Sequence, residues 1–270
     1  MGIHFWRHKR SFAGLALVLG FIVFTGVGYA SDPYQFNCYV VGWSHLQQIS
    51  PSVYVDPTMQ PRERIRFLRD IRLARRRVGQ FFGALKDAPI IVAGPLNTVY
   101  RVYGSAAGTT GITHLTMVKD YTVLGPNGVN VDVISHELTH GELKVRLGWN
   151  NFGKVPVWFD EGMTMYNDER PTYSEAAYQK LTDHGRTAPR LSAIASRIGF
   201  YDAATDQRIS DERVYINFIV AKHEFTRWYK IVGRRGVNQL MTVVRAGKNF
   251  TQAYKEIEDG AAYATTDERP

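Results

Sequence analysis

The chain has 270 residues, of which 44% are hydrophobic and 21% are charged, and this composition excludes a disordered, collagen-like or low-complexity protein. Lysine and arginine outnumber aspartate and glutamate by 33 to 25, so the formal net charge is +8. The single cysteine, Cys38, excludes an intramolecular disulfide and a cysteine-based zinc or redox motif. The chemistry of the chain must therefore come from His, Asp, Glu, Tyr and Ser side chains.

The first thirty residues have the pattern of an export signal. Arg7, Lys9 and Arg10 precede an uncharged apolar run at residues 12–27, and the small residues Gly28 and Ala30 follow it. The uncharged stretch is also about as long as a helix that spans a bilayer. We therefore expect residues 1–30 to be either a cleaved signal peptide or a membrane anchor. Residues 31–270 are then exported, to the periplasm or cell envelope or as a secreted protein.

The first half of the exported part is predicted to mix strands with one long helix. Short strands are expected at 38–43, 52–55 and 90–93, and as a pair at 114–117 and 121–124 before a turn at 125–128. A helix is expected over 62–85, where apolar residues recur at helical spacing between two prolines.

The second half is predicted to be mostly helical. The expected helices are 131–147 with Gly148 as its cap, about 156–168, one that starts with a capping box of Thr172 and Glu175, 212–231 ended by Gly233, 236–246 ended by Gly247, and one or two turns at 250–258. The sequence therefore predicts an α+β fold in a single domain, with an α/β lobe at 31–128 and a helical lobe at 129–270.

The residues that can carry chemistry are concentrated between positions 136 and 161. His136, Glu137 and His140 form an HExxH pattern inside the predicted helix 131–147. Residues four apart share a helix face, so the two histidines can hold one zinc ion while Glu137 faces the metal-bound water. Glu161, on the next predicted helix, completes a His₂Glu set that leaves one position open. We expect one Zn²⁺ per chain.

The segments HELTH at 136–140 and WFDEG at 158–162 resemble the gluzincin metallopeptidases, the clan that contains thermolysin and the aminopeptidase-N-like enzymes. The resemblance is close over about residues 132–165 and looser over about 50–260. It implies a zincin-like fold with HExxH on a central helix, with His136, His140 and Glu161 as zinc ligands. It implies Glu137 as the general base of a zinc peptidase that hydrolyses peptide bonds.

Three departures limit what this resemblance implies. Twenty residues separate His140 from Glu161, more than in the aminopeptidases, so the connecting loop differs. The Asn-Glu-x-x-Ser-Asp element of thermolysin and the metzincin extension are both absent from the sequence. No Gly-Ala-Met-Glu-Asn-like element is present either, so the exopeptidase specificity does not carry over and we expect an endopeptidase.

The resemblance also suggests which groups assist the reaction. The helix around Tyr215 is similar to the tyrosine-bearing helix that follows the third ligand in this clan, so Tyr215 is predicted to stabilise the oxyanion, the alternative being a core tyrosine. Asp160 is either a partner of a ligating histidine or a carboxylate favoured by the helix dipole. In the clan, the position of residues 113–124 supplies the cleft wall for an extended peptide or protein substrate; the alternative is an interior hairpin. Other candidate oxyanion donors are Tyr166, His184 and His223.

A second feature is the density of arginine between Arg62 and Arg77, where eight arginines stand against Glu63 and Asp70. Arg62, Arg69 and Arg76 lie seven apart and so share a stripe of the predicted helix. One interpretation is that this helix docks onto an anionic surface, such as lipid head groups or an acidic polymer. The alternative is that its arginine-rich face is only solvated. Nucleic acid is not expected as a partner, because the chain is predicted to be exported and carries no reading motif.

Three functions are therefore compatible with the sequence. The first is an exported zinc endopeptidase. The second is a non-catalytic zinc-binding envelope protein on a peptidase-like scaffold, which would have no need of the base Glu137. The third is an anionic-surface-binding or structural protein in which HExxH is a coincidence.

Overall fold

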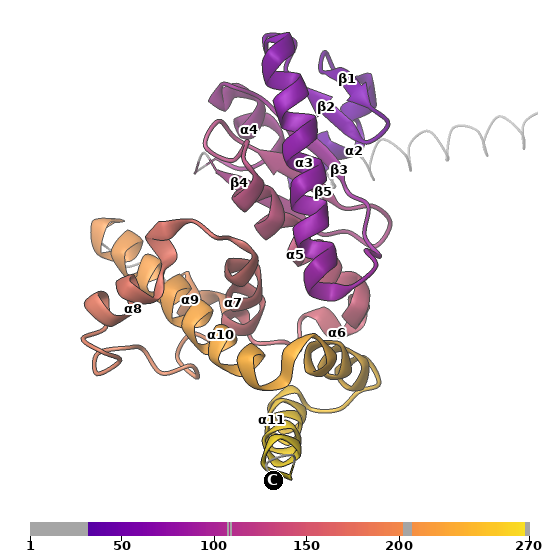
Figure 1. Cartoon of the computed structure of the whole chain (residues 1–270). Coiled ribbons are helices and arrows are strands. Elements are labelled where there is room, and N and C mark those ends of the chain that lie inside the picture. The colour runs from indigo at the N-terminus through magenta and orange to yellow at the C-terminus, as the bar shows by residue number, and fades with distance from the viewer. Residues whose placement is uncertain (1–31, 107, 109, 202–206, 268–270) are drawn as a thin grey trace, which may run out of the picture.

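The computed structural model describes residues 32–106, 108, 110–201 and 207–267, so the predicted signal or anchor at 1–30 lies outside the described residues (Figure 1). The described elements are, in chain order, α2 (Pro33–Tyr39), a 3-10 helix η1 (Val41–Trp43), β1 (Gln47–Ser50), β2 (Val53–Val55), α3 (Pro61–Phe82), β3 (Ile90–Ala93), α4 (Asn97–Tyr103), β4 (Gly111–His114), β5 (Tyr121–Leu124), α5 (Val131–Leu147), α6 (Trp149–Phe152), α7 (Val157–Asn167), a 3-10 helix η2 (Pro171–Tyr173), α8 (Glu175–Leu181), α9 (Arg197–Phe200), α10 (Gln207–Arg245) and α11 (Phe250–Asp267).

A mixed five-stranded sheet forms the first half of the fold, with strand order β1-β2-β3-β5-β4. The three inner strands β2, β3 and β5 run parallel, and the two outer strands β1 and β4 pair antiparallel to their neighbours. Helices α3 and α5 cover one face of the sheet, while α2 and α4 cover the other (Figure 1). Because the inner strands β3 and β5 are buried on both faces, they read as short apolar runs such as Ile90–Ala93.

Helix α5 lies between the two halves of the molecule and packs against α3 on the sheet side and against α7 and α10 on the helical side. Asn130 caps its first turn by accepting a hydrogen bond from the Val133 N–H. Gly148 ends it with a φ of 78°, a left-handed conformation that favours glycine. The described fold is therefore α+β, with the helix that bears His136 and His140 at its centre.

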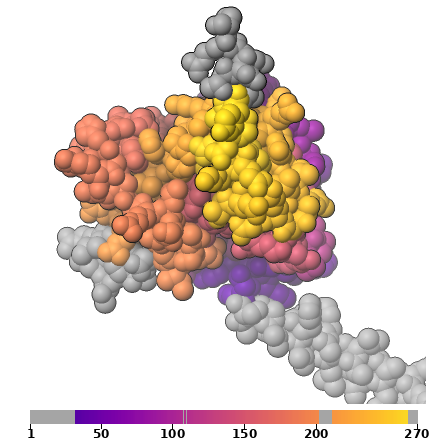
Figure 2. Space-filling view, turned by 90° about the horizontal axis from the view of Figure 1, so that it is seen from below, coloured from indigo at the N-terminus to yellow at the C-terminus, as the bar shows by residue number. Residues whose placement is uncertain are grey.

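The helical half packs around α7, which lies against α10. At Gly162 of α7 a Cβ atom would lie 2.4 Å from the carbonyl oxygen of Ala221 on α10, so only glycine allows this approach. The aromatic side chains of Phe159, Trp228 and Tyr254 pack together across α7, α10 and α11. Figure 2 shows α11 and the end of α10 as one continuous gold and yellow surface beside the orange segment that precedes α10.

The expected strand at 38–43 is wrong: α2 and η1 occupy this region. Asp32 accepts a hydrogen bond from the Gln35 N–H and Pro33 stands in the first turn, so a capped helix begins there. Its apolar residues Cys38 and Val41 are buried against the sheet. The helix expected over 62–85 ends at Phe82, because Gly83 has a φ of 93°.

Other boundaries also differ from expectation. The strand expected at 114–117 is β4 at Gly111–His114, whereas β5 and β3 lie where predicted. Ser174, and not Thr172, caps α8. The two helices expected either side of Gly233 form one element, α10, whose backbone is non-helical at that glycine, and α11 extends well beyond residue 258. Within the described ranges, none of the helices is both long enough and apolar enough to cross a membrane.

Candidate metal centre

Three side chains from two helices converge at the centre of the molecule. His136 and His140 project from one face of α5, and Glu161 projects toward them from α7. The Glu161 Oε2 atom lies 3.6 Å from His136 Nε2 and 3.8 Å from His140 Nε2. One ligand atom from each residue lies within 4.8 Å of the others, so this group can hold a metal ion.

Burial makes the centre electrostatically unusual. The side chains of His136, His140 and Glu161 are 12%, 14% and 6% exposed. Burial keeps the pKa of His136 well below its usual value, and burial together with the neighbouring Asp160 raises the pKa of Glu161 to about 7. Burial also opposes the charged form of His140, but the carboxylates of Asp160 and Glu161 outweigh it and raise that pKa. A cation placed between these groups would favour deprotonation of each.

Each histidine has a carboxylate on the side away from Glu161. His140 Nδ1 lies 2.8 Å from Asp160 Oδ1, and His136 Nδ1 lies 3.9 Å from Asp168 Oδ2. Asp168 is completely buried and is held by the guanidinium of Arg170. Only the contact of His140 is a hydrogen bond, since His136 Nδ1 is buried without a hydrogen-bond partner among the described residues. A carboxylate hydrogen-bonded behind a histidine fixes the ring orientation and leaves its other nitrogen free for a metal. The predicted partnership of Asp160 with a histidine is therefore present.

Glu137 lies beside this group with its carboxylate held from the sheet. The Thr113 hydroxyl donates a 2.8 Å hydrogen bond to Glu137 Oε2 from strand β4. A Cβ atom at Gly111 would lie 2.8 Å from Glu137 Oε1, so the absence of a side chain at Gly111 makes room for the carboxylate. Burial raises the pKa of Glu137 above its usual value.

The four predicted residues His136, Glu137, His140 and Glu161 line one cavity of about 360 Å³. Strand β4, one of the two edge strands of the described sheet, forms one wall of it. The remaining lining comes from other elements and includes Leu115, Phe152, Arg197, Tyr201 and Phe218. The cavity is large enough to admit part of an extended chain beside the strand.

The structure does not bring Tyr215 to this group. Its hydroxyl donates a 2.6 Å hydrogen bond to the Thr172 carbonyl, and Tyr215 is not among the cavity lining. Tyr201, in the segment after α9, is there instead and donates a short hydrogen bond to Glu161 Oε1. The other tyrosine and histidine candidates also lie elsewhere: Tyr166 packs against Phe81 and Tyr229, His184 bonds Gln179, and His223 bonds Glu175.

Tyr201, Gly111 and Arg197 are among the lining residues of this cavity that the sequence did not predict, and Thr113 was predicted only as part of the cleft wall. Gly111 lies just before the predicted cleft wall at 113–124 and Thr113 inside it, so the edge-strand expectation pointed to that region. Tyr201 and Arg197 follow the end of α7 by 30 positions or more in a stretch without periodicity, and no local pattern marks them. The Arg197 guanidinium lies 5.6 Å from the centre of the Tyr201 ring.

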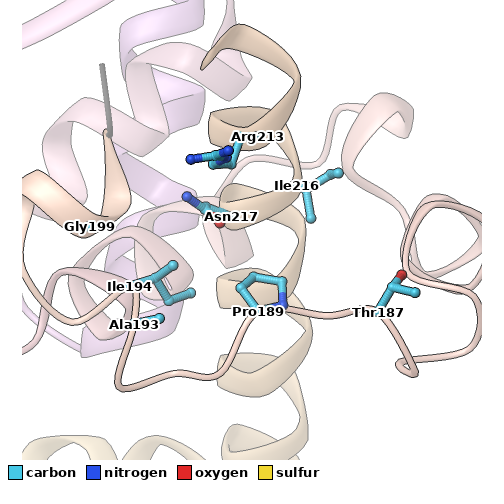
Figure 3. Close-up of a pocket in the computed structure, with 8 residues that line it drawn as sticks. All are labelled: Thr187, Pro189, Ala193, Ile194, Gly199, Arg213, Ile216 and Asn217. Atoms are coloured by element: carbon cyan, nitrogen blue, oxygen red, sulfur yellow. The ribbon is translucent and has the colours of Figure 1, made fainter. Parts of the chain in front are cut away.

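A second cavity of about 440 Å³ lies between α10 and the segment that leads to α9 (Figure 3). In Figure 3, Arg213 and Asn217 project from the helix, while Pro189, Ala193 and Ile194 come from the segment. No histidine, cysteine, aspartate or glutamate is among its lining residues in the described part of the chain. This second cavity therefore lacks the histidine and carboxylate side chains that surround Glu161 in the first cavity.

Comparison with protein-family models, curated proteins and solved structures found no match.

Proposed function

We propose that the chain is an exported, zinc-dependent endopeptidase with a zincin-like arrangement of its metal ligands. His136, His140 and Glu161 hold one Zn²⁺, and Glu137 is the general base. The observation that carries this proposal is the convergence of the three ligand atoms from α5 and α7 in a cavity that also holds the Glu137 carboxylate. The gluzincin-like sequence pattern at 136–162 gives the same assignment of roles.

The donor set fits zinc. Imidazole nitrogen and carboxylate oxygen bind zinc at about 2.0–2.2 Å, so ligand atoms around a four-coordinate ion lie about 3.3–3.6 Å apart. The 3.6 and 3.8 Å separations from Glu161 Oε2 to the histidine nitrogens are close to this spacing. Two histidines and one glutamate are also the donors of a catalytic site, which keeps one position open, rather than of a closed structural site.

The proposed reaction is hydrolysis of a peptide bond. Zinc held by His136, His140 and Glu161 would lower the pKa of a bound water to about 7 and would polarise the carbonyl oxygen of the substrate. Glu137 accepts the proton of the attacking water and returns it to the departing amine. The hydrogen bond from Thr113 holds the carboxylate at the cavity wall, and burial raises its pKa, which favours acceptance of the proton from water.

A second group is needed to stabilise the negative oxygen that develops on the attacked carbonyl. Tyr201 is a tyrosine that lines the same cavity, and its hydroxyl donates a hydrogen bond to Glu161. Burial and the neighbouring Glu161 carboxylate raise its pKa, so the hydroxyl stays protonated and able to donate at neutral pH. We therefore assign Tyr201 the oxyanion role that the sequence suggested for Tyr215.

The substrate is proposed to lie as an extended strand along β4. Among the described strands β4 pairs only with β5, so its other edge is free of strand partners. Gly111, Ile112 and Thr113 of this strand line the cavity next to Glu137. Main-chain hydrogen bonds to an edge strand bind peptides without strong dependence on sequence, which suits an endopeptidase.

The test is hydrolysis of a mixture of internally quenched peptides by the full chain supplied with zinc. Wild-type protein should hydrolyse them, and activity should vanish with a chelator and return with zinc. Glu137→Gln should keep about one zinc per chain and lose at least about a thousandfold in kcat. Glu169→Gln is the matched control, because this exposed carboxylate pairs with Arg77 away from the cavity.

Two results would contradict the proposal. Hydrolysis that is unchanged in Glu137→Gln would mean that another group is the base. Stoichiometric zinc without hydrolysis of any peptide in wild-type protein would favour the non-catalytic zinc-binding alternative.

A further inference from the structure

One face of helix α3 projects away from the sheet and is wholly exposed. Positions three, four and seven apart share a helix face, and this face carries Arg62, Ile65, Arg66, Arg69, Arg72, Leu73 and Arg76, all of them exposed. The apolar face of the same helix, with Phe67, Ile71 and Val78, packs into the core. Helix α3 therefore presents five arginines and two aliphatic side chains to its surroundings.

The two acidic residues of α3 lie off this face and are already engaged. Glu63 accepts the Gln60 backbone N–H in the capping box at the start of the helix. Asp70 is buried and accepts a hydrogen bond from the guanidinium of Arg69. Apart from Arg69, the arginines of the outward face are thus not paired with carboxylates of the same helix.

The arginines of α3 divide into two groups. Arg64 donates to the Met59 and Pro57 carbonyls, and Arg77 pairs with Asp132, so these two hold the fold together. Of the remaining six, Arg69 donates to its neighbour Asp70, and five make no hydrogen bond or ion pair with any residue that the structure describes: Arg62, Arg66, Arg72, Arg75 and Arg76. Contacts within the fold therefore do not explain why most of these arginines lie on the outward face.

The aliphatic residues on this face narrow the choice of partner. Ile65 is 71% exposed and Leu73 is 38% exposed, each between arginines. A soluble polyanion would contact the arginines and leave these side chains in water. A lipid surface satisfies both groups, because phosphates meet the guanidinium groups while aliphatic side chains enter the boundary of the acyl region.

We propose that this face of α3 docks onto a bilayer that contains anionic phospholipid, with the helix axis in the plane of the surface. The arginines from Arg62 to Arg76 span about 21 Å along the helix, long enough to contact several head groups. None of the residues on this face lines the cavity around Glu161, so docking leaves that cavity accessible. The proposal does not depend on the predicted role of residues 1–30 or on the proposed peptidase activity.

The experiment measures co-flotation of the full chain with vesicles of phosphatidylcholine alone and of phosphatidylcholine mixed with phosphatidylglycerol. Residues 1–30 are present in every sample, so the quantity of interest is the increase that phosphatidylglycerol produces. The variant Arg62→Gln/Arg72→Gln/Arg76→Gln removes three arginines without known partners. The control variant Arg190→Gln/Arg234→Gln/Arg235→Gln removes the same charge from exposed positions outside α3.

We expect the phosphatidylglycerol-dependent increase in binding to fall at least about tenfold in the α3 variant and less than about twofold in the control. It should also fall as salt is raised, because exposed charges are screened. Equal losses in the two variants, or no loss in either, would overturn the assignment to α3.

A second variant separates a lipid surface from a free anion or a soluble polyanion. Ile65→Ser should weaken binding to the mixed vesicles by about threefold or more, because the aliphatic contact is lost. Inorganic phosphate at the ionic strength of the assay should not compete beyond its effect as a salt. Tight binding to soluble polyphosphate with no effect of Ile65→Ser on vesicle binding would show that the partner is a polyanion and would overturn the lipid proposal.

Discussion

His140 Nδ1 lies 2.8 Å from Asp160 Oδ1, although the two residues come from different helices. Asp160 precedes Glu161 directly in the chain, so α7 supplies both the carboxylate that faces the metal position and the carboxylate behind one of the histidines. The contact fixes the ring of His140 so that Nε2 points at Glu161. One helix turn therefore orients two of the three proposed ligands.

The first prediction follows from this contact. Asp160→Asn should keep the fold but weaken zinc binding by about 10–100-fold, because the ring loses the negative partner that orients it and raises its basicity. Competition with a chromophoric chelator measures the affinity. Asp183→Asn is the matched control, since Asp183 pairs with Arg186 on the surface. Affinities equal in the two variants would remove Asp160 from the account of the centre.

A second prediction distinguishes two tyrosines. Tyr201→Phe removes the hydroxyl that reaches Glu161, whereas Tyr215→Phe removes one that is bound to the Thr172 carbonyl. We expect Tyr201→Phe to keep zinc and lower kcat by about 10–1,000-fold, and Tyr215→Phe to change kcat less than about threefold. Steady-state kinetics on one quenched peptide measure both. A large loss in Tyr215→Phe alone would restore the role suggested by the sequence.

A third prediction concerns the packing that places Glu161. Gly162→Ala puts a methyl group 2.4 Å from the Ala221 carbonyl oxygen and forces α7 away from α10. We expect about 1–3 kcal/mol lower stability and a weaker zinc affinity. Gly153→Ala is the control, because a Cβ there meets nothing within 4 Å. Thermal unfolding with and without zinc measures both effects, and equal midpoints for the two variants would contradict close α7–α10 packing.

A fourth prediction concerns pH. Burial, and next the neighbouring Asp120, raise the pKa of Asp87 from 3.8 to about 6, and Oδ2 of both residues is buried without a hydrogen-bond partner. Between these values the folded chain holds a proton that the unfolded chain has lost, so this group's contribution to stability falls as pH rises from about 4 to 6. Asparagine cannot ionise. Asp87→Asn should therefore gain about 1–2 kcal/mol relative to wild type on going from pH 4.5 to 8.

Chemical denaturation of both proteins at the two pH values provides the measurement. An Asp87→Asn effect that does not change with pH would mean that the carboxyl group titrates normally in the folded chain.

The features predicted correctly from the sequence are those that the spacing of residues along a helix determines. Helix α5 and the common face of His136 and His140 follow from one helical period and its glycine cap, and the structure has both. Glu161 was predicted because it follows at the start of a second apolar helix, and α7 brings it to the histidines. The arginine stripe of α3 likewise follows from period alone, and Arg62, Arg69 and Arg76 are all exposed.

Long-range contacts explain the failures. The run 38–43 has residues that favour strands, but the Asp32 cap and the burial of Cys38 and Val41 against the sheet make it helical. Helical periodicity places Tyr215 on α10 but does not set which neighbour its hydroxyl meets. Tyr201 reaches the cavity only through the path of the chain between α8 and α10, which no local pattern encodes.

The most direct test of the central claim is the zinc content of the purified full chain after dialysis against zinc at neutral pH, measured beside Glu161→Gln and Glu169→Gln. We expect about one zinc per chain in wild type and in Glu169→Gln, and at least about a tenfold weaker affinity in Glu161→Gln. Zinc that binds equally in all three proteins, or in none of them, would contradict a centre built from His136, His140 and Glu161.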